Sequence, residues 1–266
     1  FPAMQLGGAQ ENVDQVRSGA IFGVFTSIAY FSRSVPEYEA VSLPFLFDSR
    51  EQAFALMDGE VGDYLDAKMA EEGFVNLGYM ELGFRHVTND VRPIETMADF
   101  DGLKIRLQPN EVHLDSMRAV GANPTPMDIS EVYSALQQGV LDGQENPYNI
   151  IATRGFDEVQ TYLSDSGHFF DFINAVANQE RFEEFSAEHQ EAVREAMRTA
   201  VLWQREEAAA QEEKFREVLI ERGMTFTPIS DEVRAELREA TSGVVDGLRA
   251  RIGDEPIDLV LANIEP

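Results

Sequence analysis

The sequence contains no cysteine, which excludes disulfides, thiolate metal sites and a cysteine nucleophile. Positive charge is also scarce, because 21 lysines and arginines stand against 48 aspartates and glutamates, for a formal net charge of −27. Proteins that bind nucleic acid need clustered lysine and arginine, so this composition argues against a nucleic-acid partner. No apolar run approaches the roughly 20 residues that a membrane-spanning helix requires.

The motifs of common enzymes are missing as well. The sequence has no HExxH, no GxSxG, no GxGxxG and no phosphate-binding loop, and no histidine pair has the spacing of a zinc site. Paired carboxylates of a hydrolase stay possible, because the spacing that matters for them is spatial. What is present is 266 residues with 44% hydrophobic content, enough for one large folded domain or two lobes.

The most informative stretch runs from residue 102 to residue 147 and alternates strand and helix patterns. The predicted elements are a strand at 103–107, a helix at 112–120, an extended segment at 124–127, a helix at 130–139 with Ser130 as its cap, a strand at 140–142 and a polar turn at 143–147. This succession indicates an α/β sheet.

Two polar residues of this stretch fall at strand ends, where open α/β sheets bind their ligands. The planar guanidinium of Arg106 matches a carboxylate in two parallel hydrogen bonds, and Asn146 supplies a neutral donor and acceptor. Together they suit an organic anion. The alternative is that Arg106 forms a structural ion pair and that Asn146 only closes a turn.

The same stretch resembles the solute-binding proteins of TRAP (tripartite ATP-independent periplasmic) transporters. Their hallmark has the form GLKIR, GA-PTPM, SE-Y-ALQ-G-DGQENP, which residues 102–108, 121–127 and 130–147 match almost letter for letter. The similarity continues at residues 1–7 (FPAMQLG), 82–85 (LGFR) and 166–168 (SGH) and therefore covers most of the chain. The resemblance implies a two-lobed α/β periplasmic binding protein fold.

The resemblance also implies how the chain divides. Lobe I would consist of residues 1–84 and 171–210, and lobe II of residues 85–170 and 211–266. We expect a strand and a helix to precede the sequence, about the size of a βα unit, and a signal peptide to have been removed.

Three long elements would join the lobes. Crossing strands near residues 82–90 and 168–177 would form the hinge. A helical pattern from Ser186 to Gly223 would run along both lobes, either straight or kinked near residues 208–210.

The family resemblance assigns roles to residues outside the central stretch. Arg85 corresponds to the family's second important arginine and is predicted to contact the ligand, with an ion pair between lobes as the alternative. Thr26 and Ser27 follow an apolar strand and would meet the ligand or cap a helix. Asn174 would point into the cleft or satisfy an inter-strand hydrogen bond.

Two residues bear on the identity of the ligand. Ile129 occupies a predicted ligand-contacting position where the sialic-acid branch of the family has an aromatic residue, and Asp128 replaces a small residue of that branch. Both differences disfavour sialic acid and favour a compact sugar acid, hydroxy acid or four-carbon dicarboxylate, with a sulfonate also open.

The predicted function is that of a periplasmic solute-binding protein and not of an enzyme. It would bind a small organic acid anion and deliver it to the membrane permease of a TRAP transporter, as a monomer that needs no cofactor or metal. The alternatives are a carboxylate-dependent hydrolase and the ligand-binding module of a signalling receptor.

Overall fold

The computed structural model describes residue 1 and residues 5–264. The Pro2, Ala3 and Met4 part of the predicted family match lies outside the described residues. Seven described strands form one mixed sheet in the order β1-β6-β2-β5-β3-β4, with β7 paired to β6. The strands are β1 Gly23–Ser27, β2 Phe74–Asn89, β3 Lys104–Leu107, β4 Asn123–Pro126, β5 Gly143–Asn146, β6 Tyr162–Asn178 and β7 Thr225–Pro228.

Helices surround this sheet. The α-helices are α1 Ala9–Arg17, α2 Arg50–Met57, α3 Glu60–Glu71, α4 Glu111–Ala119, α5 Ile129–Gln137, α6 Tyr148–Thr153, α7 Gln179–Glu183, α8 Ala187–Glu221, α9 Asp231–Ala240, α10 Val244–Ile252 and α11 Glu255–Asn263. Two 3₁₀ helices, η1 Ile28–Phe31 and η2 Pro36–Ser42, complete the part of lobe I that follows β1. Within the described residues, no helix combines the length and apolar character needed to cross a membrane.

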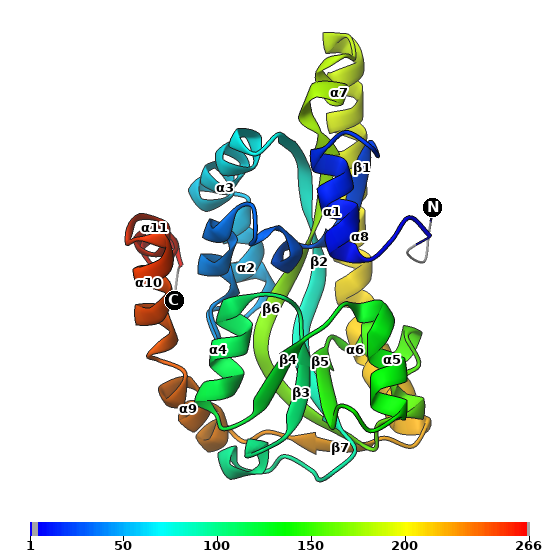
Figure 1. Ribbon diagram of the computed structural model, residues 1–266, viewed down its shortest axis with the longest axis vertical. Coiled ribbons are helices and arrows are strands. Elements are labelled where there is room, and N and C mark those ends of the chain that lie inside the picture. Colours follow the sequence, from blue (N-terminus) through cyan, green and yellow to red (C-terminus); the bar gives the residue numbers. More distant parts are fainter. Residues whose placement is uncertain (2–4, 265–266) are drawn as a thin grey trace.

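The predicted two-lobed α/β fold is confirmed, and three long elements pass through both lobes (Figure 1). Strands β2 and β6 form one antiparallel pair that extends beyond the predicted hinge segments. The pairing register shifts next to Gly78 and Gly83, whose φ angles of 138° and 114° are readily adopted only by glycine. Such bulges bend a strand pair locally, which fits a connection between two lobes.

Helix α8 is continuous over 35 residues, or about 50 Å at 1.5 Å per residue. The Ser186 side chain accepts a hydrogen bond from the backbone N–H of His189, so the predicted cap is confirmed. Near its middle, Gln204 makes hydrogen bonds of 2.8 and 2.9 Å with the backbone N–H and C=O of Glu81. The helix is thereby fastened to β2 beside the second bulge.

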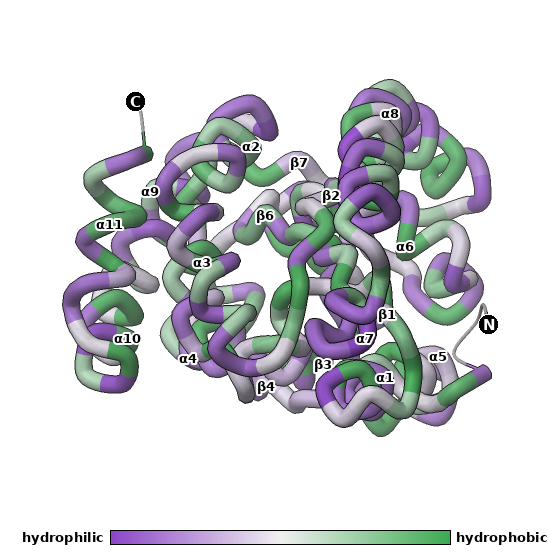
Figure 2. Tube along the Cα trace, turned by 90° about the horizontal axis from the view of Figure 1, so that it is seen from above, coloured by the Kyte–Doolittle hydropathy of each residue, from purple (hydrophilic) through white to green (hydrophobic). Residues whose placement is uncertain are grey.

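Each lobe has its own apolar core. The core of lobe I includes Phe31, Tyr38 and Phe74, whereas lobe II is built around Ile105, Leu107 and Ile151. Val244, Leu248, Ile257 and Val260, on α10 and α11, pack into the core of lobe I. These two helices lie along one side of the molecule, away from α5 and α6 (Figure 2). The assignment of residues 211–266 to lobe II stays a prediction, since the same core cluster also includes Val112 of α4.

Two local predictions in the central stretch were wrong. Residues 143–147 were expected to form a polar turn, but Gly143–Asn146 is β5, a buried strand between β2 and β3. The N-cap of α5 is Asp128 and not Ser130, because the carboxylate of Asp128 accepts the hydrogen bond from the backbone N–H of Ser130. The polar character of β5 misled the prediction, since such residues usually stay on the surface.

Candidate functional site

A hollow of about 1140 Å³ lies where the two lobes face each other. The residues that line the hollow include Ser27 and Tyr30 from lobe I and Gln108, Ile129 and Asn146 from lobe II. Strands β3 and β5 are parallel neighbours, so their carboxyl ends meet at one edge of the sheet and bring Gln108 and Asn146 together. The rest of the hollow is largely apolar and extends over β1 and β6.

Arg106, on β3, forms a hydrogen bond from lobe II to lobe I. Its Nη2 donates to the hydroxyl of Tyr30 in lobe I at 3.2 Å, and its Nε donates to the backbone carbonyl of Met127 at 2.8 Å. The side chain is fully buried, and its Nη1 has no hydrogen-bond partner. Among residues 1 and 5–264, no carboxylate forms an ion pair with Arg106.

The electrostatic state of Arg106 follows from this isolation. Burial lowers the pKa of Arg106 below its usual value, against the opposing influence of Tyr30 and Glu145. A guanidinium nevertheless keeps its proton in proteins, so Arg106 is a buried cation with which no carboxylate of residues 5–264 forms an ion pair. A carboxylate that enters beside Tyr30 would compensate this charge.

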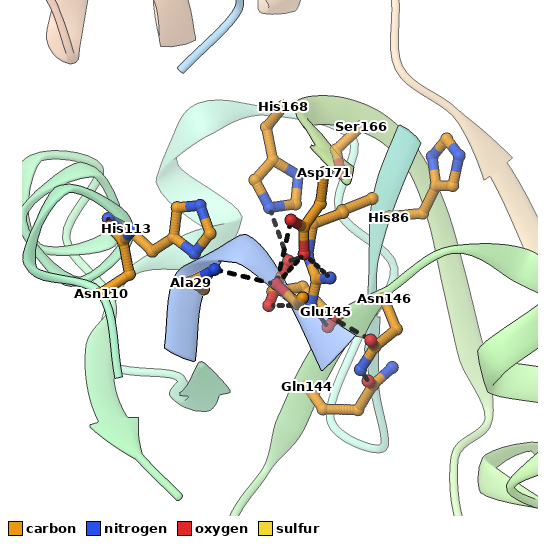
Figure 3. Close-up of polar contacts among 12 residues, drawn as sticks. Ala29, His86, Asn110, His113, Gln144, Glu145, Asn146, Ser166, His168 and Asp171 are labelled. Atoms are coloured by element: carbon orange, nitrogen blue, oxygen red, sulfur yellow. Dashed lines mark hydrogen bonds and ion pairs between the residues drawn. The ribbon is translucent and has the colours of Figure 1, made fainter. Parts of the chain in front are cut away.

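Arg85 is equally buried but is surrounded by acids from two strands. Its Nη2 donates to Glu145 Oε1 at 2.8 Å, its Nε donates to Glu145 Oε2, and its Nη1 donates to Asp171 Oδ2 at 3.0 Å. Nη2 also donates to Asn146 Oδ1 at 3.1 Å. Figure 3 shows Glu145, Asp171 and Asn146 converging on this point. The structure thus contains the interlobe ion pair that the sequence left as the alternative role of Arg85.

The acids around Arg85 have opposite pKa shifts. Burial alone would raise the pKa of Glu145, but the charge of Arg85, its hydrogen bonds to the carboxylate and the nearby imidazole of His168 hold that pKa well below its usual value. At Asp171 burial outweighs Arg85 and the hydrogen bond from Ser27, so the pKa of Asp171 is raised. Glu145 is therefore the partner of Arg85 whose charged form the surroundings favour.

The cluster also orients two residues that line the hollow. The hydroxyl of Ser27 donates to Asp171 Oδ2 at 2.7 Å and accepts from the backbone N–H of Ala29 at 3.1 Å, so Ser27 caps η1. Asn146 is fixed by Arg85 and by a hydrogen bond of 2.6 Å to Gln144. Arg85 therefore positions Ser27 of lobe I, through Asp171, and Asn146 of lobe II, directly.

The remaining predicted site residues differ in position. Thr26 and Ile129 line the hollow, as does Asn146. Asn174 does not line it, because its amide is turned into lobe I and donates to the hydroxyl of Tyr38 at 2.8 Å. Of the two roles considered for Asn174, a hydrogen bond within the protein is present, although it goes to Tyr38 in η2 and not to a neighbouring strand.

The sequence did not indicate Glu145 and Gln108 as parts of this site. Glu145 was placed in a turn, although a carboxylate beside a strand arginine was a signal that could have been used. Within the part of the chain that the structure describes, no group of three or more histidine or acidic side chains could hold a metal ion. The lining residues can thus offer hydrogen bonds to a guest, whereas Arg106 does not itself line the hollow and is connected to it through Tyr30, which does.

The sequence and fold also match known proteins. A family model described as bacterial extracellular solute-binding protein, family 7, matches residues 1–251. The chain is 33% identical over 262 residues to the 2,3-diketo-L-gulonate-binding periplasmic protein YiaO of Escherichia coli, covering 98% of this chain and 79% of YiaO.

Solved structures agree with this match. A TRAP periplasmic solute-binding protein from a Polaromonas species, bound to D-erythronate, is 35% identical with a TM-score of 0.94, covering 98% of this chain and 86% of that one. Another from Sulfurospirillum deleyianum, with bound succinate, is 32% identical with a TM-score of 0.94, covering 100% and 87%. Proteins of this kind bind solutes for transport and are not enzymes. The chain belongs to the bacterial extracellular solute-binding proteins of family 7, the periplasmic solute-binding proteins of TRAP transporters.

Proposed function

We propose that this protein binds a small organic acid anion in the hollow between its lobes, with Arg106 as the carboxylate clamp. The proposal depends on one observation: the Arg106 guanidinium is fully buried, and within the described part of the chain one of its nitrogens lacks a hydrogen-bond partner and no carboxylate forms an ion pair with it. A carboxylate is the group that a guanidinium binds in two parallel hydrogen bonds. Binding would supply the missing partner to Nη1 and compensate a charge that is costly to bury alone.

The other lining residues fit the body of such a ligand. Asn146, Gln108 and Ser27 can each form hydrogen bonds with hydroxyl groups, as a sugar acid or hydroxy acid requires. Ile129 offers an apolar surface where a flat aromatic contact would suit a larger sugar ring. We therefore favour a compact sugar acid or hydroxy acid, in line with the D-erythronate bound by the relative from Polaromonas, with a four-carbon dicarboxylate as the second choice.

The role of Arg85 in this proposal is to position other residues. Its donors are occupied by Glu145, Asp171 and Asn146, so its contribution to ligand binding is to hold Asn146 in place from β2. The protein would act in the periplasm as a monomer and deliver its ligand to the membrane permease of a TRAP transporter, as its family does.

A thermal-shift screen against organic acids tests the proposal. A ligand at 100 times its dissociation constant stabilises the folded protein by about 2.7 kcal/mol, which raises the melting temperature by roughly 5–10 °C. Arg106→Lys should remove this shift, because an ammonium cannot reproduce the planar two-point contact.

The matched control is Arg118→Lys, on the exposed surface of lobe II, where the arginine pairs with Asp115. This variant should keep the full ligand shift. A ligand shift that persists in Arg106→Lys would refute the clamp. Recovery of the ligand unchanged after prolonged incubation, followed by NMR, separates binding from the hydrolase alternative.

A further inference from the structure

Asp128 forms a hydrogen-bonded connection between the two lobes. In lobe II it is the N-cap of α5, where its Oδ1 accepts from the backbone N–H of Ser130 at 3.0 Å and from the Ser130 hydroxyl at 2.7 Å. Its second oxygen, Oδ2, accepts from the backbone N–H of Ala9 in lobe I at 2.9 Å. A single carboxylate thus joins residues 119 positions apart in the sequence.

The hydrogen bond to Asp128 satisfies a backbone N–H at the start of α1 that has no partner within lobe I's own N-cap residue. Ala9 is the first residue of α1, and its N–H can have no partner within the helix. The N-cap of α1 is Gly8, which has no side chain to accept such a bond. Asp128 therefore caps two helices at once, its own α5 and, from the opposite lobe, α1.

The Asp128 carboxylate lies so close to Gly8 that a side chain at this position would collide with it. A Cβ atom at Gly8 would lie 2.8 Å from Oδ2 of Asp128, closer than carbon and oxygen can pack. Glycine is not required there by the backbone, since the φ angle of Gly8 is −65°. The absent side chain matters because it lets the carboxylate reach Ala9. Both views of the fold place α1 beside α5 (Figures 1 and 2).

The contact lies at the edge of the proposed binding site. Ala9 and Ile129, the neighbours of the two capping positions, both line the hollow between the lobes. Burial would raise the pKa of Asp128, but hydrogen bonds from Ser130 and Ala9 and the charge of Arg106 hold it below the usual value. The group is thus a carboxylate at neutral pH, the form that a helix N-terminus favours.

We propose that Asp128 is a latch that holds the lobes closed over the bound ligand by capping α1 from lobe II. Opening the cleft would separate Asp128 from Ala9 while leaving the bond to Ser130 intact. The latch acts on the exit of the ligand, because its bond exists only when the lobes are together. Its effect on the ligand rests on the proposed function, whereas the contact itself does not.

The first test separates the two caps of Asp128. Asp128→Ser keeps a good N-cap for α5 but is too short to reach Ala9. With the strongest ligand of the screen, we expect dissociation about tenfold faster than in the wild type, measured by stopped-flow fluorescence, with little change in the association rate. An unchanged dissociation rate would overturn the latch.

The second test approaches the contact from lobe I. Gly8→Ala leaves Asp128 unaltered but places a methyl group against its carboxylate, so it should also speed dissociation. The double variant should be less than additive, because each change breaks the same contact. Ser230→Ala, which removes the N-cap of α9 in the core region of lobe II, is the control that weakens a helix start without changing dissociation.

A third measurement needs no ligand. The Ala9 amide donates its hydrogen bond to Asp128, so Asp128→Ser should increase the hydrogen-exchange rate of this amide in the ligand-free protein, while amides in the middle of α1 keep theirs. Equal exchange at Ala9 in both proteins would reject the latch even if no ligand is found. Failure of every organic acid in the screen would reject the proposed function and leave this readout intact.

Discussion

Two fully buried arginines lie on strands of the same sheet, but the groups around them differ. Arg85 on β2 is matched by Glu145 and Asp171, whereas the hydrogen bonds of Arg106 within the described chain go to a hydroxyl and a carbonyl. Burial alone would lower the pKa of both guanidinium groups. At Arg85 the adjacent acids reverse the shift and raise its pKa, but at Arg106 burial prevails and the pKa is lowered.

This difference indicates that Arg85 has a structural role, whereas Arg106 is the candidate for ligand binding. A matched buried charge holds strands together, and removing one partner leaves the other buried and uncompensated. An unmatched buried charge weakens the empty protein and becomes favourable only when a guest of opposite charge arrives. Since the protein as a whole is strongly negative, this local cation is what can attract an anion into the cleft.

Arg85→Met should show the largest loss of stability. The change leaves the carboxylates of Glu145 and Asp171 buried without a cation, at a cost of about 3–5 kcal/mol in the free energy of unfolding. Urea denaturation of the ligand-free protein measures it. A loss of stability below about 1 kcal/mol would mean that the ion pairs of Arg85 with Glu145 and Asp171 do not hold the fold together.

Glu145→Gln should lower the free energy of unfolding by less than Arg85→Met does, and it should change how that free energy depends on pH. The folded pKa of Glu145 lies below the ordinary value of 4.5, so its contribution to stability is present above pH 4.5 and is lost as the pH falls toward the folded pKa. Urea midpoints between pH 3 and pH 7 should therefore depend less on pH in Glu145→Gln than in the wild type.

Asp171→Asn is the counterpart of that experiment. Burial raises the folded pKa of Asp171, so its contribution is present below the ordinary value of 3.8 and is lost as the pH rises through the folded pKa. The acid-side pH dependence should become steeper in Asp171→Asn. Identical slopes in the two variants would contradict the opposite pKa shifts.

Arg106→Met should barely change the stability of the ligand-free protein. Two hydrogen bonds are lost, but the cost of burying an unmatched cation is lost with them, so we expect a net change within about 1 kcal/mol. The same variant should bind no organic acid in isothermal titration calorimetry. A loss as large as that of Arg85→Met would show that Arg106 is also a structural residue.

Ser27 and Thr26 provide the finest comparison, since adjacent hydroxyls line the same hollow. Ser27→Ala removes a bond to Asp171 and the cap of η1 and should cost about 1 kcal/mol. Thr26→Ala should stay within about 0.5 kcal/mol, because the Thr26 hydroxyl has no hydrogen-bond partner among the described residues. If chemical denaturation shows the same loss of stability in both variants, the hydrogen bond from Ser27 to Asp171 does not contribute to stability.

Several features of the site were predictable from local pattern. The alternation around Arg106 predicted its strand, and the Ser186 cap and Gly223 predicted the extent of α8. The strand at residues 143–146 was missed because three consecutive polar residues look like a surface turn. Only the neighbouring strands β2 and β3 supply the partners that make those residues stable in the interior.

By itself the sequence determined the family, the α/β class and the two strand arginines that could bind an acid, because these depend on motifs and on periodicity over a few residues. Which arginine is matched, and which aspartate joins the lobes, was decided by the tertiary structure. The sheet order puts β2 between β5 and β6, so Arg85 meets acids 60 and 86 residues away. Asp128 likewise meets an amide 119 residues away, a distance over which local sequence pattern carries no information about contact.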